Sequence, residues 1–284
     1  MALAITVTLL VVEAVGAYLT GSLALLADAG HLATDAVGLI VAMTAVVLAA
    51  RPPSARRTFG FGRLEVLAAA VNALLLLGVG GTVLVKAIGR LSDPVPVPSG
   101  PLLALGVIGL VGNLAALAVL ARGDRSSLNL RGALLEVFGD AVGSVAVVAS
   151  AVVIALTGWQ QADAVASLMI AALILPRSVL LLRDAAHVLL EGAPSGIDAD
   201  QVRAALLGIH GVVDVHDVHI WSITSGETAV SVHLVVDGVT CIGCGKTSVL
   251  DLAAAVLVQR FGLSHSTVQI EHLAHDRHET TQHS

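Results

Sequence analysis

The 284-residue chain has few charged residues, 13% of the total, and few aromatic residues, 2% of the total. About a quarter of the residues of a soluble globular protein are charged, so the first shortage argues against that class. The hydrophobic share is 56% and, with so few aromatics, it consists mainly of Ala, Val and Leu. Such side chains suit helices that pack closely in lipid. The composition therefore predicts a polytopic protein of the lipid bilayer.

Cysteine and concentrated positive charge are also lacking. The two cysteines, Cys241 and Cys244, are too few for a disulfide framework. The formal net charge is −6, whereas nucleic-acid binding needs a concentrated basic surface. We therefore expect no nucleic-acid partner.

Six apolar stretches are long enough to cross a hydrocarbon core, which takes roughly 20 helical residues. Arginines are concentrated in the connections after the second and the fourth stretch. By the positive-inside bias these connections are cytosolic, so we expect both termini in the cytosol. The stretches cover residues 2–23, 29–50, 64–90, 101–121, 132–157 and 164–183.

Charge and histidine content divide the chain near residues 191–194. Residues 1–183 hold 11 basic and 9 acidic residues, whereas residues 184–284 hold 4 and 12. Only one of the 11 histidines, His31, lies in the first part. The second part mixes helix and strand patterns, which indicates an α+β fold. These differences predict a transmembrane domain at 1–190, a cytosolic α+β domain at 191–272 and a flexible, His-containing tail at 273–284.

Within the α+β domain, turn residues and changes of periodicity mark five elements, and Asp198 is the expected N-cap of the first. The expected helices are 198–209 and 246–261, and the expected strands are 212–223, 227–237 and 266–272.

Ionisable side chains within the apolar stretches are expensive and demand an explanation. The second stretch contains His31 and Asp35, and the fifth contains Glu136 and Asp140. Both pairs are spaced i, i+4, which places the two side chains on one helix face. Two such faces turned toward each other offer one imidazole nitrogen and three carboxylates. This set suits a divalent cation, and zinc is the natural occupant of a mixed nitrogen and oxygen site.

Either pair alone is also explained by an interhelical hydrogen bond that holds the helices together. Two pairs with the same spacing in two different stretches, with no basic partner near either, favour compensation by a metal ion or by protons. Two more acids are less informative. Glu13 is interpreted as a packing or pathway residue, and Asp28 as a residue near the helix N-terminus.

In this setting, four segments resemble the cation diffusion facilitator family, which exports zinc and related divalent metals. The resemblance covers nearly the whole chain and implies a six-helix bundle with a cytosolic ferredoxin-like or metallochaperone-like domain. It also implies a homodimer in the inner membrane that exchanges metal for protons by alternating access. The segments are GSLALLADAGHLATDAVGL (21–39), FGFGRLEVLAAAVNALLLL (59–77), LEVFGDAVGSVAV (135–147) and VHDVHIWSITSG (215–226).

The resemblance implies that His31, Asp35, Glu136 and Asp140 form the transport site. Zinc-transporting relatives usually have His at the position of Glu136. With three ionised carboxylates and a neutral imidazole the set carries −3, which favours oxygen-preferring ions or leaves one carboxylate protonated. Zinc is the first expectation, and cadmium, cobalt, manganese and iron are alternatives. Many relatives have His at position 62, in the loop after the second stretch, where this chain has Gly. We therefore predict no metal site in that loop.

In the cytosolic domain the resemblance implies a second metal site, formed by His216, His233 and Glu271, with His265 as a weaker candidate. Histidines on exposed strands can also be plain solvated residues. Strict alternation along the first strand would place His216 on one face and His219 on the other.

Cys241 and Cys244 form a C-x-x-C pair, which is half of a structural zinc site. They are interpreted either as auxiliary ligands for a soft metal or as reduced thiols without a defined role. The acidic charge of this domain attracts cations and predicts repulsion between two copies until metal binds. The domain is therefore a candidate metal-responsive regulator.

Two other classes of protein are considered. An intramembrane metalloenzyme would carry a motif such as H-E-x-x-H, and neither this motif nor a Ser-His or Cys-His arrangement occurs in the apolar stretches. A membrane metal sensor that does not transport would share the same metal-binding residues. We predict a divalent metal exporter rather than an enzyme.

Overall fold

The computed structural model describes residues 2–121, 128–224, 226–237 and 248–272. Its contacts divide the chain into two units. The first consists of residues 1–44 and 68–183, and the second of residues 45–67 and 184–284.

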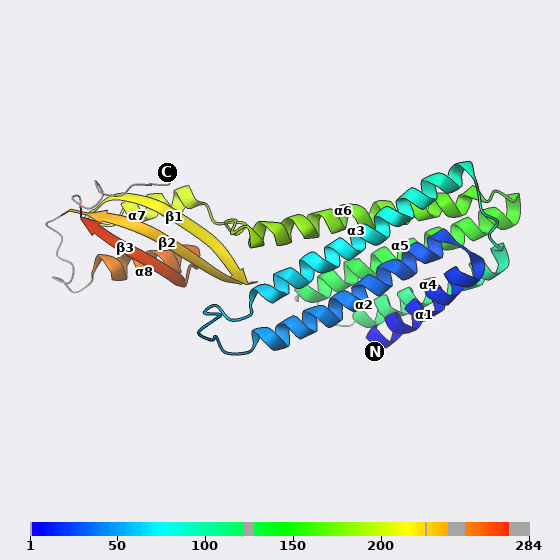
Figure 1. Cartoon of the computed structure of the whole chain (residues 1–284), viewed down its shortest axis with the longest axis horizontal. Helices are drawn as coiled ribbons and strands as arrows, with labels where there is room; N and C mark the ends of the chain where they lie inside the picture. Colours follow the sequence, from blue (N-terminus) through cyan, green and yellow to red (C-terminus); the bar gives the residue numbers. More distant parts are fainter. Residues whose placement is uncertain (1, 122–127, 225, 238–247, 273–284) are drawn as a thin grey trace. The chain divides into compact units, whose positions relative to one another are not determined.

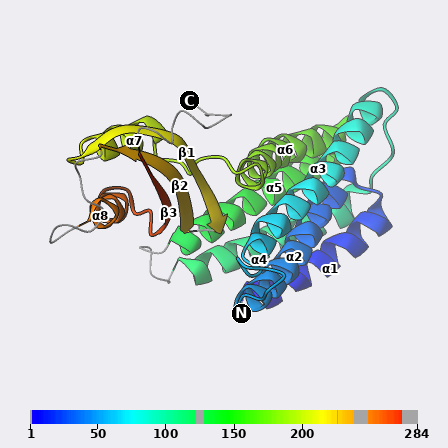
Figure 2. The ribbon, with the colours of Figure 1, turned by 60° about the vertical axis from the view of Figure 1, so that its left-hand side comes forward.

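The first unit is a bundle of apolar helices (Figures 1 and 2). Among the described residues, five helices are long and apolar enough to cross a membrane, whereas the apolar segment of α1 is the shorter Val7–Thr20. Together they confirm the predicted helical membrane fold. The helices are α1 (Ala2–Thr20), α2 (Leu23–Ala49), α3 (Arg63–Ser92), α4 (Ser99–Leu120), α5 (Leu128–Thr157) and α6 (Gln161–Leu189).

Small residues allow these helices to approach closely. A Cβ atom at Gly16 of α1 would lie 2.5 Å from Leu105 of α4, and one at Gly112 of α4 would lie 2.7 Å from Leu9 of α1. A larger residue at either position would therefore have to displace the leucine side chain of the facing helix. Buried alanines contribute to the core in the same way, which is the packing mode expected of helices in lipid.

Asp163, at the start of α6, ties three segments together at one end of the bundle. Its carboxylate accepts hydrogen bonds from Ser22 Oγ (2.5 Å) and from the backbone N–H groups of Leu23 (2.8 Å) and Ala24 (3.4 Å). It thus satisfies donors that the first turn of α2 leaves unpaired. Arg90 of α3 lies 3.4 Å from the same carboxylate, which is 1% exposed.

The second unit contains a three-stranded sheet in the order β1-β2-β3. β1 and β2 are antiparallel, and β2 and β3 are parallel. Apolar residues of the two helices pack with alternate strand residues in one core. The elements are α7 (Ala199–Leu207), β1 (Val212–Thr224), β2 (Glu227–Val236), α8 (Val249–Phe261) and β3 (His265–His272), and they confirm the predicted α+β fold.

The caps of both helices are visible. Asp198 is the N-cap of α7, as predicted, and its side chain accepts a hydrogen bond from the Asp200 N–H. α8 begins at Val249, after the N-cap Ser248, rather than at residue 246.

The first strand does not alternate simply, because it contains a bulge. Its register with β2 shifts between His216 and His219, and Asp217 between them has a φ of 51°. His216 pairs with His233 and His219 pairs with Ser231, two residues of β2 that share a face. His216 and His219 therefore lie on the same face of the sheet. The expectation that they lie on opposite faces was wrong, since the bulge adds one residue.

Candidate metal centres

The helix bundle brings together the polar side chains of its second and fifth apolar stretches. His31 Nε2 lies 3.4 Å from Asp35 Oδ2 on the same helix and 3.4 Å from Asp140 Oδ1 on α5. The side chains of His31 and Asp140 are 11% and 8% exposed. One nitrogen therefore lies between two carboxylates from different helices, a donor set that suits a divalent cation.

Glu136 belongs to the same group and has a further partner. Its carboxyl group lies in hydrogen-bonding contact with that of Asp35. Its Oε2 atom is also 3.4 Å from the guanidinium of Arg177 on α6. The expectation that neither acidic pair has a basic partner was therefore wrong. Arg177 is remote from both pairs along the sequence, and only the packing of α6 beside α5 places it here.

A cavity of about 200 Å³ adjoins these groups, although Asp35 does not line it. Its lining includes His31, Glu136, Asp140 and Arg177, and also Asp28. Asp28 is 3% exposed, and it lies beyond the first turn of α2, which begins at Leu23. The interpretation of Asp28 as a residue of the helix N-terminus was therefore wrong.

Asp28 links the cavity to a second acidic residue. It hydrogen-bonds with Glu13 of α1, which is 1% exposed. A Cβ atom at Gly109 of α4 would lie 2.8 Å from Glu13 Oε1 and 3.3 Å from Ser144 Oγ, so the glycine makes room for both. Ser144 accepts a hydrogen bond from Asn113. The packing interpretation of Glu13 agrees with this buried position between helices.

The α+β unit contains a second group of potential ligands. One ligand atom each from His216, His233 and Glu271 lie within 4.8 Å of one another. His233 Nδ1 is 2.9 Å from Glu271 Oε1, and His216 Nε2 is 3.6 Å from Glu271 Oε2. Ligand atoms around a tetrahedral zinc ion are roughly 3.3 Å apart, so small side-chain adjustments would suffice to bind it. These three residues come from β1, β2 and β3.

His216 is oriented by a neighbouring carboxylate. Its Nδ1 atom lies 3.2 Å from Asp214 Oδ2, which leaves Nε2 directed at Glu271. Arg203 of α7 lies 3.7 Å from the same aspartate. A carboxylate that accepts the N–H of a metal-binding imidazole fixes its tautomer and ring orientation.

His265, the weaker candidate ligand, does not join this group of described residues. His265 lies at the start of β3, where its ring makes an edge contact with Phe59 at 5.8 Å between centroids. Cys241, Cys244 and the tail at 273–284 lie outside the described residues.

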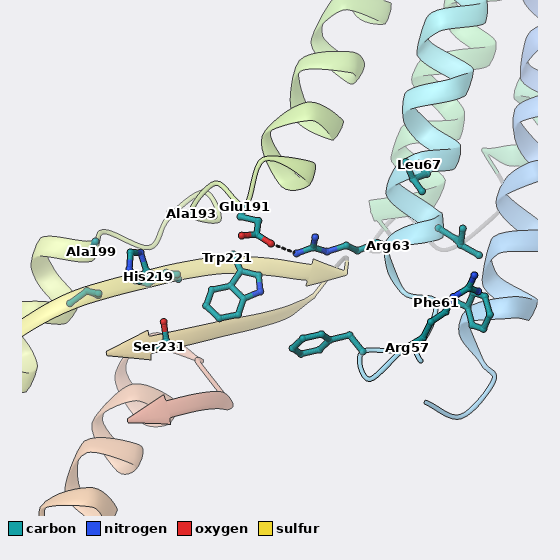
Figure 3. A pocket seen from close by; sticks show the side chains of 15 residues that line it. Arg57, Phe61, Arg63, Leu67, Glu191, Ala193, Ala199, His219, Trp221 and Ser231 are labelled. Atoms are coloured by element: carbon teal, nitrogen blue, oxygen red, sulfur yellow. Dashed lines mark hydrogen bonds and ion pairs between the residues drawn. The ribbon is translucent and has the colours of Figure 1, made fainter. Parts of the chain in front are cut away.

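A larger pocket of about 920 Å³ occupies the second unit (Figure 3). The α2–α3 loop and the strand face that carries His219 and Trp221 both line it. At its rim, Arg63 forms an ion pair with Glu191 at 3.0 Å. A Cβ atom at Gly62 would overlap the Thr224 side chain, so a larger residue at this position would have to displace it.

The fold and the site define a class of protein. It is a multi-pass membrane protein with a small α+β domain, and its helix bundle contains a group of imidazole and carboxylate side chains that suits a cation. Comparison with known proteins gives the family. Residues 1–190 match the family model described as the cation efflux transmembrane domain. Residues 194–273 match that of the cation efflux protein cytoplasmic domain. The chain belongs to the cation efflux family, whose members are metal cation transporters and not enzymes.

Three relatives illustrate the similarity. The metal cation efflux system protein CzcD of Cupriavidus metallidurans is 41% identical over 100% of this chain and 89% of its own length. The cadmium, cobalt and zinc/H(+)-K(+) antiporter of Bacillus subtilis is 38% identical over 94% of this chain and 86% of its own. The zinc transporter ZitB of Pectobacterium atrosepticum is 38% identical over 94% of this chain and 83% of its own.

Proposed function

We propose that this transporter exports zinc from the cytosol in exchange for protons. The observation that carries the proposal is the placement of His31 Nε2 at 3.4 Å from carboxylates of both α2 and α5. A borderline metal such as zinc accepts mixed nitrogen and oxygen ligands. The names of relatives, which include zinc, cadmium and cobalt, support the same class of substrate.

The exchange follows from ligand chemistry. Imidazole and carboxylate bind metal only when deprotonated, so protons that reach the site from outside favour release and their loss to the cytosol favours loading. Rocking of the bundle would expose His31, Asp35, Glu136 and Asp140 to the two sides in turn. We further propose a homodimer in the inner membrane with both termini in the cytosol, supported by the arginine-rich connections and the matched cytoplasmic domain.

In the cytosolic domain, His216, His233 and Glu271 would hold a regulatory zinc ion. The donor set fits, since two imidazoles and one carboxylate are common zinc ligands and Asp214 already orients His216. The region from 184 to 284 carries 12 acidic and 4 basic residues. Bound cations would reduce repulsion between two such domains, so metal load and dimer closure would be linked.

The decisive experiment measures zinc flux into proteoliposomes under an imposed pH gradient. Asp140→Asn removes one charged ligand and is expected to reduce the flux at least about 100-fold. Asp184→Asn, which changes an exposed carboxylate of α6, serves as the control and should transport normally. A membrane sensor would show no flux in any form, and undiminished flux in Asp140→Asn would disprove the site.

A further inference from the structure

Arg177 adds a permanent positive charge to the proposed transport site. Its guanidinium lies 3.4 Å from Glu136 Oε2, and it lines the same cavity as His31 and Asp140. Arginine stays protonated at any physiological pH. The side chains of Arg177 and Glu136 are 56% and 34% exposed, whereas that of Asp140 is 8% exposed, so the ion pair is the more accessible part of the group.

The charge of the group then matches a divalent cation. When the site binds metal, its carboxylates are deprotonated. Asp35, Glu136 and Asp140 then contribute −3 and Arg177 contributes +1, so the set with neutral His31 carries −2. A group with histidine at position 136 and no arginine would also carry −2. The ion pair is therefore equivalent in net charge to one neutral imidazole. These five side chains together balance the charge of a divalent cation, which matters because unbalanced charge is costly inside a protein.

The pairing also limits what Glu136 can donate. One of its carboxylate oxygens faces the guanidinium, which competes with a metal ion for the same electron pairs. The His31 nitrogen stays available to bind the metal. So does one carboxylate from each helix, Asp35 on α2 and Asp140 on α5. A set with one nitrogen and two free carboxylates suits zinc, whereas a third free carboxylate would suit a harder ion such as manganese.

We propose that Arg177 is a specificity-determining residue of the transport site. By holding Glu136 as a neutral ion pair, it keeps the group at −2 and favours zinc over manganese. This inference rests on the proposed function, since it requires that the group around His31 carries the transported cation.

The test compares zinc and manganese flux in proteoliposomes. Arg177→Met frees Glu136 and is expected to raise the manganese-to-zinc flux ratio about 10-fold or more, which corresponds to ~1.4 kcal/mol. In a Glu136→Gln background the same change should alter the ratio less than about 2-fold, because the carboxylate it would release is gone. Arg183→Met, on the same helix but outside the cavity lining, is the matched control and should leave the ratio unchanged.

A reciprocal pair of variants covers the case in which Arg177→Met does not fold. Glu136→His alone leaves an unpaired guanidinium beside the metal and should lower zinc flux about 10-fold or more. Glu136→His combined with Arg177→Met returns the group to −2 and should restore zinc flux. Lack of restoration, with both proteins folded, would overturn the proposal.

Other outcomes separate this inference from the proposed function. If Arg177 only supported the fold, Arg177→Met would lower both fluxes equally, and an unchanged ratio would overturn the inference while transport stood. A changed ratio that persists in Glu136→Gln would also overturn it. If wild-type protein shows no flux, transport itself fails, and competition between zinc and manganese for binding to the full chain in detergent still tests Arg177.

Discussion

The Nε2 atom of His31 lies 3.4 Å from Asp140 Oδ1, and the two residues belong to different helices, α2 and α5. The same nitrogen lies 3.4 Å from Asp35 Oδ2. A proton or a metal ion can occupy this nitrogen, but not both, because only the free imidazole nitrogen is a ligand. The geometry therefore makes proton binding and metal binding compete at the centre of the site.

Zinc binding at this centre should release protons. We expect at least about one proton per zinc near pH 6, where a substantial part of an imidazole population is protonated. Calorimetric titration in buffers of different ionisation enthalpy measures this number. The protein should carry His233→Ala, so that the cytosolic group does not contribute, and Asp140→Asn added to it should abolish the binding. Zinc binding without any proton release would refute the competition.

The Asp163 carboxylate should be a major stabilising element of the bundle. Asp163→Ala removes the acceptor for Ser22 Oγ and for the N–H groups of Leu23 and Ala24, and it leaves Arg90 without its buried partner. Loss of a buried network of this kind costs roughly 2–4 kcal/mol. Thermal unfolding of the detergent-solubilised protein would show this as a lower midpoint.

Asp184→Ala is the matched control for that measurement. Asp184 lies on the same helix with an exposed side chain, so its loss should change the stability by less than about 0.5 kcal/mol. Equal midpoints for the two variants would show that Asp163 does not anchor α2.

Which parts of the site can be predicted from sequence depends on how local the signal is. The i, i+4 spacing within one helix places His31 beside Asp35, and the structure keeps them together. Arg177 and Glu136 lie on different helices, and nothing in the sequence states which faces of α5 and α6 meet. The group formed by His216, His233 and Glu271 was predicted from the family resemblance. The strand pairing of the α+β domain brings these three residues together.

The bulge at Asp217 shows that a sequence pattern can also fail to predict the structure of a single strand. Alternation is a reliable rule for regular strands, but one residue with a φ of 51° reverses the face of every residue beyond it. Aspartate tolerates this conformation better than most residues, although its presence does not announce a bulge. His219 therefore shares a face with His216, contrary to the pattern of the sequence.

The start of α8 should respond to acid. Asp251 Oδ2 accepts hydrogen bonds from Ser248 Oγ (2.7 Å) and from the Ser248 N–H (3.2 Å). The hydroxyl bond and then the backbone bond lower the pKa of Asp251 below its ordinary value. A lowered pKa in the folded state means that the stabilisation is present above the unfolded value of about 3.9 and is lost as the pH falls through the folded value.

Amide hydrogen exchange in α8 tests this pH dependence. At pH 6 the amides of the first turn should be better protected in wild type than in Asp251→Ala. The difference should shrink below about pH 4 and vanish once Asp251 is protonated in the folded protein. Comparison at equal pH removes the intrinsic effect of pH on exchange. A difference that stays constant over this range would contradict the role of the ionised carboxylate.

Asp214 should control the zinc affinity of the cytosolic group without being a ligand. It lies 3.2 Å from His216 Nδ1 and so directs Nε2 toward Glu271. Asp214→Ala should weaken zinc binding about 10- to 100-fold, the usual effect of losing such a partner. The affinity is measured by competition with a zinc-sensitive dye on the full chain. Asp140→Asn is present throughout, so that the site in the bundle stays silent.

Asp200→Ala separates orientation from charge in that experiment. Asp200 is exposed in the same domain, and its removal changes the net charge by the same amount. Zinc affinity should therefore stay within about 2-fold of the parent protein, since an exposed charge at a distance is screened by salt. If both variants weakened binding equally, the acidic field of the domain and not the alignment of His216 would set its affinity for metal.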